Sequence, residues 1–215
     1  MNEWEFQTDL TNGWAAHGLN INGVQHVLLA WEIMLPSWRI NDASKYWSEP
    51  SLDFLVADEQ MRLTVIELKT KVTGIKLAWQ ALCQVTHRAA ELSRTLTAEN
   101  LDKAFLASWS GEHGRIKTPS RCRSFSEHHR GFFGALEFHC ETTPKIRRCI
   151  AAHEFGKSWP GILAEFNALS EDALRVRVRD ELTSKTASRE LKRFENLPSD
   201  YSSRVDGPVF TLLIT

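Results

Sequence analysis

The sequence predicts an α/β fold in which helices flank a mixed central sheet. Segments with a helical spacing of apolar residues alternate with short segments rich in β-branched and aromatic residues. This alternation is typical of layered α/β proteins rather than of helical bundles or β-sandwiches. Hydrophobic residues fill 42% of the 215 positions, which is enough for the core of one decorated domain or two small ones.

We expect a helix and then a buried strand near the start of the chain. Residues 3–17 place apolar side chains three to four positions apart, and Gly18 is expected to end this helix. Residues 24–36 are apolar, short and bounded by glycine and proline, so they suit a buried strand better than a long helix.

Two strands joined by a polar link should follow. Residues 52–57 and 63–69 are rich in branched and aromatic side chains, and the polar residues 58–62 connect them, which indicates a β-hairpin. Residues 76–96 then show helical spacing over roughly five turns. A further strand is expected at residues 104–109.

The element signals weaken beyond residue 110. Residues 111–134 are rich in Gly, Ser, Arg and His and predict a long loop, which is uncommon in a compact domain unless it is functional or disordered. We therefore divide the chain into a core, residues 1–110, and a C-terminal α+β extension, residues 111–215, packed on the same domain. The elements expected in the extension are strands at 132–139, 145–153 and 209–215 and helices at 158–169 and 170–196.

Cysteine usage and hydropathy indicate a cytoplasmic protein. The four cysteines are scattered without a C-x-x-C pair, and residues 1–5 are acidic rather than the start of an apolar export segment. The longest apolar runs are far shorter than the roughly 20 residues that a membrane helix needs, so we expect no membrane partner.

The expected hairpin would bring two carboxylates together. Asp53 and Glu67 both lie seven residues from Gln60, so a hairpin symmetric about Gln60 places them opposite each other. Strand side chains alternate in direction, and Lys69 therefore shares a face with Glu67. Facing β-carbons are about 5 Å apart, and like charges at that spacing destabilise a sheet unless something compensates them.

A divalent cation is the compensation that the chemistry favours. Two carboxylates roughly 4 Å apart repel by about 4 kcal/mol at an effective dielectric near 20, and a cation between them reverses the sign. Mg²⁺, with Mn²⁺ as a substitute, prefers a few carboxylate oxygens plus water and phosphate. Such an ion activates water for attack, and the positive charge of Lys69 orients that water or neutralises the phosphate. Asp53, Glu67 and Lys69 therefore predict phosphodiester hydrolysis.

These residues resemble a known motif. Pro50-Ser51-Leu52-Asp53, followed by Glu67-Leu68-Lys69 on the next strand, is similar to the motif of the PD-(D/E)XK nuclease superfamily, although the proline lies two residues farther from the aspartate than in the namesake. The resemblance covers about half the chain. It implies a restriction-endonuclease-like αβββαβ core, which matches the order expected for residues 3–109, and a Mg²⁺-dependent deoxyribonuclease.

The resemblance also implies further site residues. The family's acid on the first helix falls by position to Glu5, with Glu32 on the following strand as a rival. The family's glutamine on the helix after the lysine corresponds to Gln84, with Gln80 one turn earlier as the alternative. Leu68, between the two motif residues of the second strand, completes the implied metal ligands.

A local excess of positive charge suggests where nucleic acid would bind. The chain has a net charge of −1, yet residues 111–150 hold 8 Lys and Arg against 4 Asp and Glu. Arg115, Lys117, Arg121 and Arg123 are the candidates for phosphate contacts, because a flexible basic loop can close on a duplex. A solvated loop is the alternative.

Other functions stay open at this level. A catalytically silent nucleic-acid-binding or structural subunit of a repair or defence assembly is the main alternative, and an RNA-directed nuclease is another. The chain can also act as a homodimer or in a larger assembly. In a purely structural alternative, Glu67 and Lys69 form an exposed strand-end ion pair worth about 0–1 kcal/mol. A zinc site is disfavoured because the His and Cys residues lack the usual ligand spacing.

Overall fold

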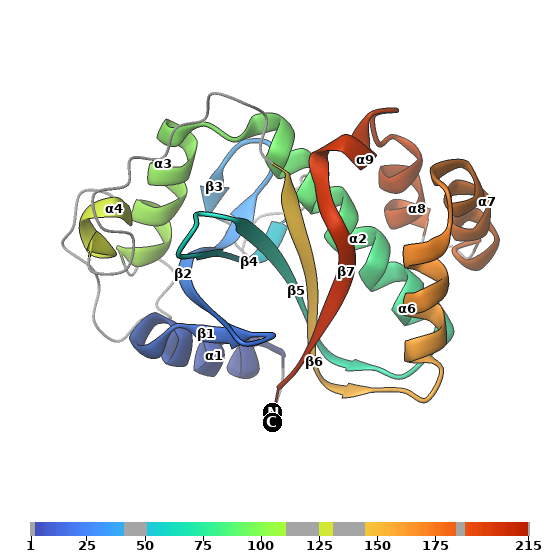
Figure 1. Cartoon of the computed structure of the whole chain (residues 1–215), viewed down its shortest axis with the longest axis horizontal. Helices are drawn as coiled ribbons and strands as arrows, with labels where there is room; N and C mark the ends of the chain where they lie inside the picture. The colour runs from blue at the N-terminus through green and yellow to red at the C-terminus, as the bar shows by residue number, and fades with distance from the viewer. Residues whose placement is uncertain (1–2, 41–50, 111–124, 131–144, 184–187, 215) are drawn as a thin grey trace.

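The computed structural model describes residues 3–40, 51–110, 125–130, 145–183 and 188–214. A mixed β-sheet forms the centre of the molecule, and helices flank it, as the sequence predicts (Figure 1). The elements are α1 (Glu3–His17), β1 (Leu19–Ile21), β2 (Val24–Met34), β3 (Arg39–Ile40), β4 (Ser51–Asp58), β5 (Leu63–Val72), α2 (Ile75–Thr95), α3 (Ala98–Trp109), α4 (Phe125–His128), β6 (Ile146–Phe155), α6 (Trp159–Ala168), α7 (Glu171–Glu181), α8 (Ser188–Glu195), α9 (Tyr201–Arg204) and β7 (Val205–Leu213).

The sheet joins an antiparallel half to a parallel half. Its strand order is β1-β2-β4-β5-β6-β7, and β3 pairs with the far end of β2. The pairs β1–β2, β2–β4 and β4–β5 are antiparallel, whereas β5–β6 and β6–β7 are parallel. β5 is therefore the strand at which the two halves meet.

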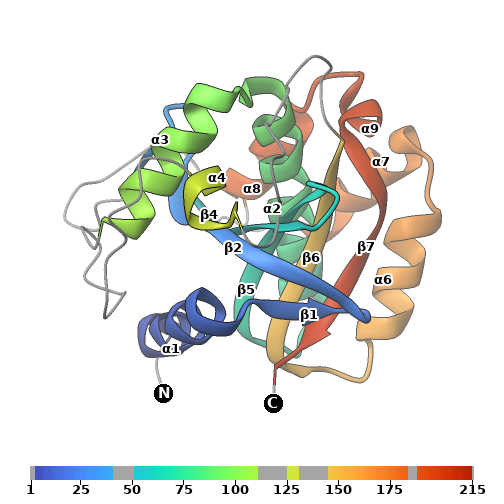
Figure 2. The same cartoon turned by 60° about the vertical axis from the view of Figure 1, so that its left-hand side comes forward.

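Helices α1 and α2 cover opposite faces of this sheet. The rings of Trp14 in α1 and Phe54 in β4 lie 4.7 Å apart, which places α1 on the Phe54 face. Side chains alternate along a strand, so Asp53 points to the other face. That face is covered by α2, whose Arg88 contacts Glu67. Figure 2 shows α3 and α4 gathered beside β2, with α6 and α7 on the β7 side.

The predicted end of the first helix is confirmed at Gly18. Its backbone N–H donates to the carbonyl of Trp14 at 2.8 Å, and its φ of +65° is the left-handed conformation that favours glycine. A β-carbon at this position would lie 2.5 Å from the carbonyl oxygen of His26, so the tight entry into β1 also requires glycine.

The strand predicted at residues 104–109 is wrong. These residues form the second half of α3, which begins after Thr97, whose side chain accepts a hydrogen bond from the N–H of Asn100. The hydrophobic period explains the error, because the buried positions recur at helical rather than alternating spacing. These positions are Leu101, Ala104, Phe105, Ser108 and Trp109.

The strand that pairs with the free side of β5 is β6, which begins at Ile146, long after α2 and α3. β6 lies parallel to β5, with Glu67 opposite Ile150, and β7 extends the sheet beyond it. Strands from both sides of residue 110 thus belong to one sheet. The strand predicted at 145–153, the helices predicted at 158–169 and 170–196 and the closing strand are confirmed, whereas 132–139 lies outside the described residues. Of the helices that the structure describes, none has both the length and the apolar character needed to cross a bilayer.

Candidate functional site

The register of β4 and β5 places Asp53 beside Glu67. Four consecutive residue pairs, ending with Phe54 opposite Ile66, have the predicted symmetric register. Asp53 and Glu67 follow at the next position, on the face covered by α2. The Asp53 carboxylate also accepts a hydrogen bond of 2.7 Å from the backbone N–H of Leu68. The hairpin and the cross-strand placement of the two acids are therefore as predicted.

Glu67 is buried and has two cationic neighbours. Its side chain is only 1% exposed. One carboxylate oxygen, Oε1, accepts a hydrogen bond of 2.5 Å from the Nζ of Lys69, and the other, Oε2, lies 3.4 Å from Nη1 of Arg88. Within the described residues, Oε2 has no hydrogen-bond partner. The pair of Glu67 and Lys69 is thus not the exposed strand-end ion pair of the structural alternative.

Arg88 is a member of the site that the sequence does not single out. It lies in α2, is 7% exposed, and donates a hydrogen bond from Nε to the carbonyl of Ser51 at the start of β4. The available signal is its position in the helix, since an arginine within the buried stripe of α2 needs an acidic partner on the sheet below. That partner is Glu67.

The cluster consists of two acidic residues, Asp53 and Glu67, and two basic residues, Lys69 and Arg88. Burial, and then the neighbouring charge of Glu67, raise the pKa of Asp53 to about 7. Burial opposes the charge of Lys69, but the carboxylates of Glu67 and Asp53 outweigh it and raise the pKa of that amine. Arg88 shows the same balance, and its pKa is raised by Glu67 and Asp53 despite its burial. Lys69 and Arg88 therefore stay protonated at neutral pH.

The donor set of this site fits a Mg²⁺ ion. The N–H and C=O of one strand residue point to the same side, so the carbonyl of Leu68 lies on the side from which its N–H reaches Asp53. The carboxylates of Asp53 and Glu67 and the carbonyl of Leu68 are oxygen ligands of the kind that Mg²⁺ takes together with water, and Oε2 of Glu67 has no hydrogen-bond partner among the described residues. No cluster of three or more His, Cys, Asp or Glu side chains suited to a metal occurs within the described segments. The fit therefore depends on two carboxylates and a carbonyl.

The two candidates for the additional acid lie in different places. Glu5 is an exposed residue of α1, the helix on the opposite face of the sheet from Arg88. Glu32 lies in β2 between residues 31 and 33, which pair with residues 54 and 52 of β4, so its register position is opposite Asp53. Its φ of 52° is a left-handed conformation, rare for a glutamate and frequent at functional sites. The strand register thus favours Glu32.

The remaining predicted site residues have no described contact with Asp53, Glu67 or Lys69. Gln84 is half-buried in α2 one turn before Arg88, and Gln80 lies one further turn away on the same stripe. Neither glutamine side chain forms a hydrogen bond with the described part of the chain. The basic residues Arg115, Lys117, Arg121 and Arg123 lie outside the described residues.

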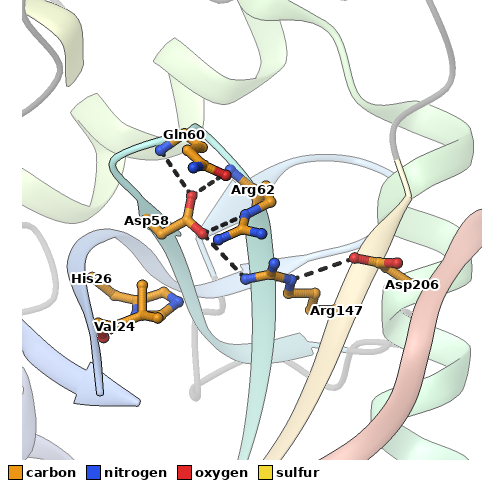
Figure 3. Close-up of polar contacts among 7 residues, drawn as sticks. All are labelled: Val24, His26, Asp58, Gln60, Arg62, Arg147 and Asp206. Atoms are coloured by element: carbon orange, nitrogen blue, oxygen red, sulfur yellow. Dashed lines mark hydrogen bonds and ion pairs between the residues drawn. The ribbon is translucent and has the colours of Figure 1, made fainter. Parts of the chain in front are cut away.

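A second polar cluster fastens the turn of the same hairpin (Figure 3). Asp58 accepts hydrogen bonds from the backbone N–H groups of Gln60 and Arg62, from Nε of Arg62 at 2.6 Å and from Nη1 of Arg147 at 3.1 Å. Arg147 also pairs with Asp206 of β7 at 3.4 Å. The sequence predicts only a polar link here, although an aspartate that bonds the backbone two residues on is a known turn signal. Each charge of this cluster has an opposite charge beside it.

Comparison of the chain with family models, with curated proteins and with solved structures gives no match.

Proposed function

We propose that the protein is a metal-dependent nuclease that hydrolyses phosphodiester bonds at the site formed by Asp53, Glu67 and Lys69. The main support is that β4 and β5 bring the carboxylates of Asp53 and Glu67 to one side of the sheet, where Lys69 donates a hydrogen bond to Glu67. The raised pKa of Asp53, caused by burial and then by the charge of Glu67, supports a functional site, because strongly shifted pKa values cluster at such sites.

The roles of the side chains follow from their charges. Asp53, Glu67 and the carbonyl of Leu68 would hold Mg²⁺ or Mn²⁺, which supplies activation of water and stabilisation of charge on the phosphate. Lys69 stays protonated, so it serves as a positive charge toward the phosphate rather than as a general base. Arg88 holds the Glu67 carboxylate from the α2 side and ties it to Ser51 at the start of β4.

The order of elements supports a restriction-endonuclease-like core. The chain runs through α1, β2, β4, β5 and α2 before it reaches β6, which is the αβββαβ order with the short strands β1 and β3 and the helices α3 and α4 added. DNA as the substrate comes from the family resemblance of the motif residues. Glu32 is the acid that we add to the site, in preference to Glu5, because its register position is opposite Asp53.

A substrate panel tests this function. The purified chain is incubated with plasmid, linear duplex, single-stranded DNA and RNA, each with Mg²⁺, Mn²⁺ or EDTA. We expect cleavage of DNA that depends on the metal and stops with EDTA. Cleavage of RNA alone would replace the deoxyribonuclease by a ribonuclease. Absence of metal-dependent turnover with all four substrates would contradict an enzyme.

One observation favours a second candidate, a nucleic-acid-binding subunit without turnover. Lys69 and Arg88 already place two positive charges beside Asp53 and Glu67, so the cluster is neutral without a metal. In that case titration with Mg²⁺ or Mn²⁺ would give no heat and no rise in melting temperature, whereas nucleic acid would still bind.

A further inference from the structure

Arg148 is a buried cation that has no acidic partner in the described part of the chain. It lies in β6 and is 7% exposed, and its hydrogen-bond partners among the described residues are neutral, the hydroxyl of Thr86 at 3.1 Å and the carbonyl of Gly207 at 2.6 Å. Its Nε has no hydrogen-bond partner among the described residues. Within that part of the chain, no Asp or Glu forms an ion pair with it. Burial lowers the pKa of Arg148 to about 10, which still leaves it charged at neutral pH.

The same arginine lines a cavity of about 290 Å³ between the C-terminal helices and β7. Phe166, Leu169 and Leu174 form an apolar part of its lining, and the rest is largely polar. Tyr201 and Ser202 of α9, both of which carry a hydroxyl group, also line it. The cavity therefore combines one positive charge, apolar surface and hydroxyl donors.

The acidic residue that borders this cavity does not neutralise Arg148. Glu171 also lines it, but its carboxylate pairs with Arg175 at 3.0 Å. The guanidinium of Arg175 lies in turn over the ring of Tyr201, 5.6 Å from its centroid. Glu171 and Arg175 thus neutralise each other, and no described acidic residue neutralises the charge of Arg148.

We propose that this cavity binds a small organic anion, whose carboxylate or phosphate group pairs with Arg148 and whose apolar part packs against Phe166, Leu169 and Leu174. A buried charge is costly unless an opposite charge and hydrogen bonds compensate it, and a bound anion supplies both. The planar guanidinium suits a carboxylate or a phosphate equally, because both offer two acceptor oxygens. The volume limits the ligand to a small molecule.

The cavity is separate from the Asp53–Glu67 site. Its lining comes from β6, α6, α7, α9 and β7, whereas the site residues come from β4, β5 and α2. The proposal does not depend on nuclease activity and is tested by binding alone.

Calorimetry and thermal unfolding with small probes test the proposal on the full chain. The probes are inorganic phosphate, phenyl phosphate and benzoate, with benzyl alcohol as the neutral counterpart. We expect one of the aromatic anions to bind and to raise the melting temperature, and the neutral probe to do neither. Stronger binding of phenyl phosphate or of benzoate identifies the acid group. Equal effects of the charged and neutral probes, or no binding of any anion, would overturn the proposal.

Two variants and a control place the anion at Arg148. Arg148→Met keeps much of the stem and removes the charge, so we expect binding to weaken about ten- to hundredfold, as for loss of a hydrogen bond to a charged group. Ser202→Trp leaves Arg148 in place but puts a large side chain at an exposed position of the lining, and it should also abolish binding, which tests the placement if Arg148→Met does not fold. The control Arg179→Met removes an exposed arginine of α7 outside the lining. Unchanged affinity in Ser202→Trp, or equal loss in Arg179→Met, would refute this placement.

Discussion

At the scale of single residues, Lys69 is the test of chemistry at the proposed nuclease site. Replacement by methionine keeps the stem volume and removes the charge toward the phosphate. We expect cleavage to fall by about 10²- to 10³-fold, as when one preorganised transition-state contact is lost. Single-turnover cleavage together with the melting temperature separates the loss of charge from a loss of packing.

Lys71 offers a matched control two positions along the same strand. Its ion pair with Glu154 is exposed on both sides, so Lys71→Met should change neither cleavage nor stability appreciably. If Lys69→Met cleaves as fast as the wild type, Lys69 has no catalytic role.

Replacement of Asp53 tests whether this residue is a metal ligand. Asp53→Asn removes one of two neighbouring buried charges, so we expect the metal-free melting temperature to rise. The same change should remove the gain in melting temperature that Mg²⁺ gives the wild type, because that gain reflects preferential binding to the folded protein. Equal metal binding by calorimetry in both proteins would show that Asp53 is not a ligand.

Prediction from sequence succeeds for residues whose placement is local. Asp53, Glu67 and Lys69 are brought together by one short hairpin, and strand alternation alone fixes their faces. Arg88 and Glu32 depend on how a helix and a neighbouring strand pack on that hairpin, and a sequence pattern does not specify such packing. The metal, the chemistry and the basic residues between 111 and 124 stay predictions.

At the scale of elements, Arg88 connects α2 to the two strands of the site. Arg88→Met would leave buried Glu67 with a single cation and the Ser51 carbonyl without its donor. We expect a loss of about 3–5 kcal/mol in the free energy of unfolding, as for other broken buried ion pairs.

A double-mutant cycle measures this connection. Arg88→Met with Glu67→Gln should cost clearly less than the sum of the two single changes, because the unpaired charge is gone in the double variant. Urea unfolding of the four proteins gives the coupling energy. Additive effects, or an equal loss in the exposed control Arg94→Met, would show that the two elements are not joined through this pair.

Asp58, at the turn between β4 and β5, should make the stability of the fold depend on pH. Burial would raise the pKa of Asp58, but the hydrogen bonds from the backbone and side chain of Arg62 outweigh it, so the folded-state pKa is lowered. A lowered pKa gives stability that is present above the unfolded-state pKa and is lost as the pH falls through the folded-state pKa.

Asp58→Asn should therefore cost about 1–3 kcal/mol at pH 7 and much less under acid conditions. Urea unfolding across the range from pH 7 to below the unfolded-state pKa measures the difference. Asp206→Asn is the control, since that carboxylate is 46% exposed and should matter little. A cost for Asp58→Asn that does not change with pH would contradict an ionised Asp58.

Elements that glycine, proline or a polar link bounds in the sequence are the ones that the sequence predicts correctly. α1, β2, the hairpin and α2 follow from spacing and from glycine or proline boundaries. The segment 104–109 fails because six apolar and small residues suit either a strand or half a helix. The helical period becomes visible only when the window begins at Thr97, the residue that caps α3.

At the scale of the whole molecule, the described sheet does not divide at residue 110. Residues 64–72 of β5 pair with residues 147–155 of β6, and residues 64–68 and 148–152 within these strands are buried. A fragment of residues 1–110 would therefore expose one full edge of β5. We expect this fragment to lack cooperative thermal unfolding and to associate through that edge.

Circular dichroism during heating, with light scattering, checks the fragment against the full chain. A control truncated after Ile214, which removes only the last residue, should unfold like the full chain. A cooperative, monomeric fragment 1–110 would show that the antiparallel half is a domain by itself.

β5 pairs with one strand that is synthesised just before it and one that is synthesised much later, which also matters for folding during synthesis. β4, its antiparallel partner, is synthesised just before it, whereas 73 residues lie between Val72 and the first residue of β6. At about 5–20 residues per second, a ribosome needs roughly 4–15 s to produce that stretch. During this time β5 has one edge without its parallel neighbour. A nascent-chain pause within residues 73–145 would lengthen this interval, so translation speed there should affect the yield of folded protein.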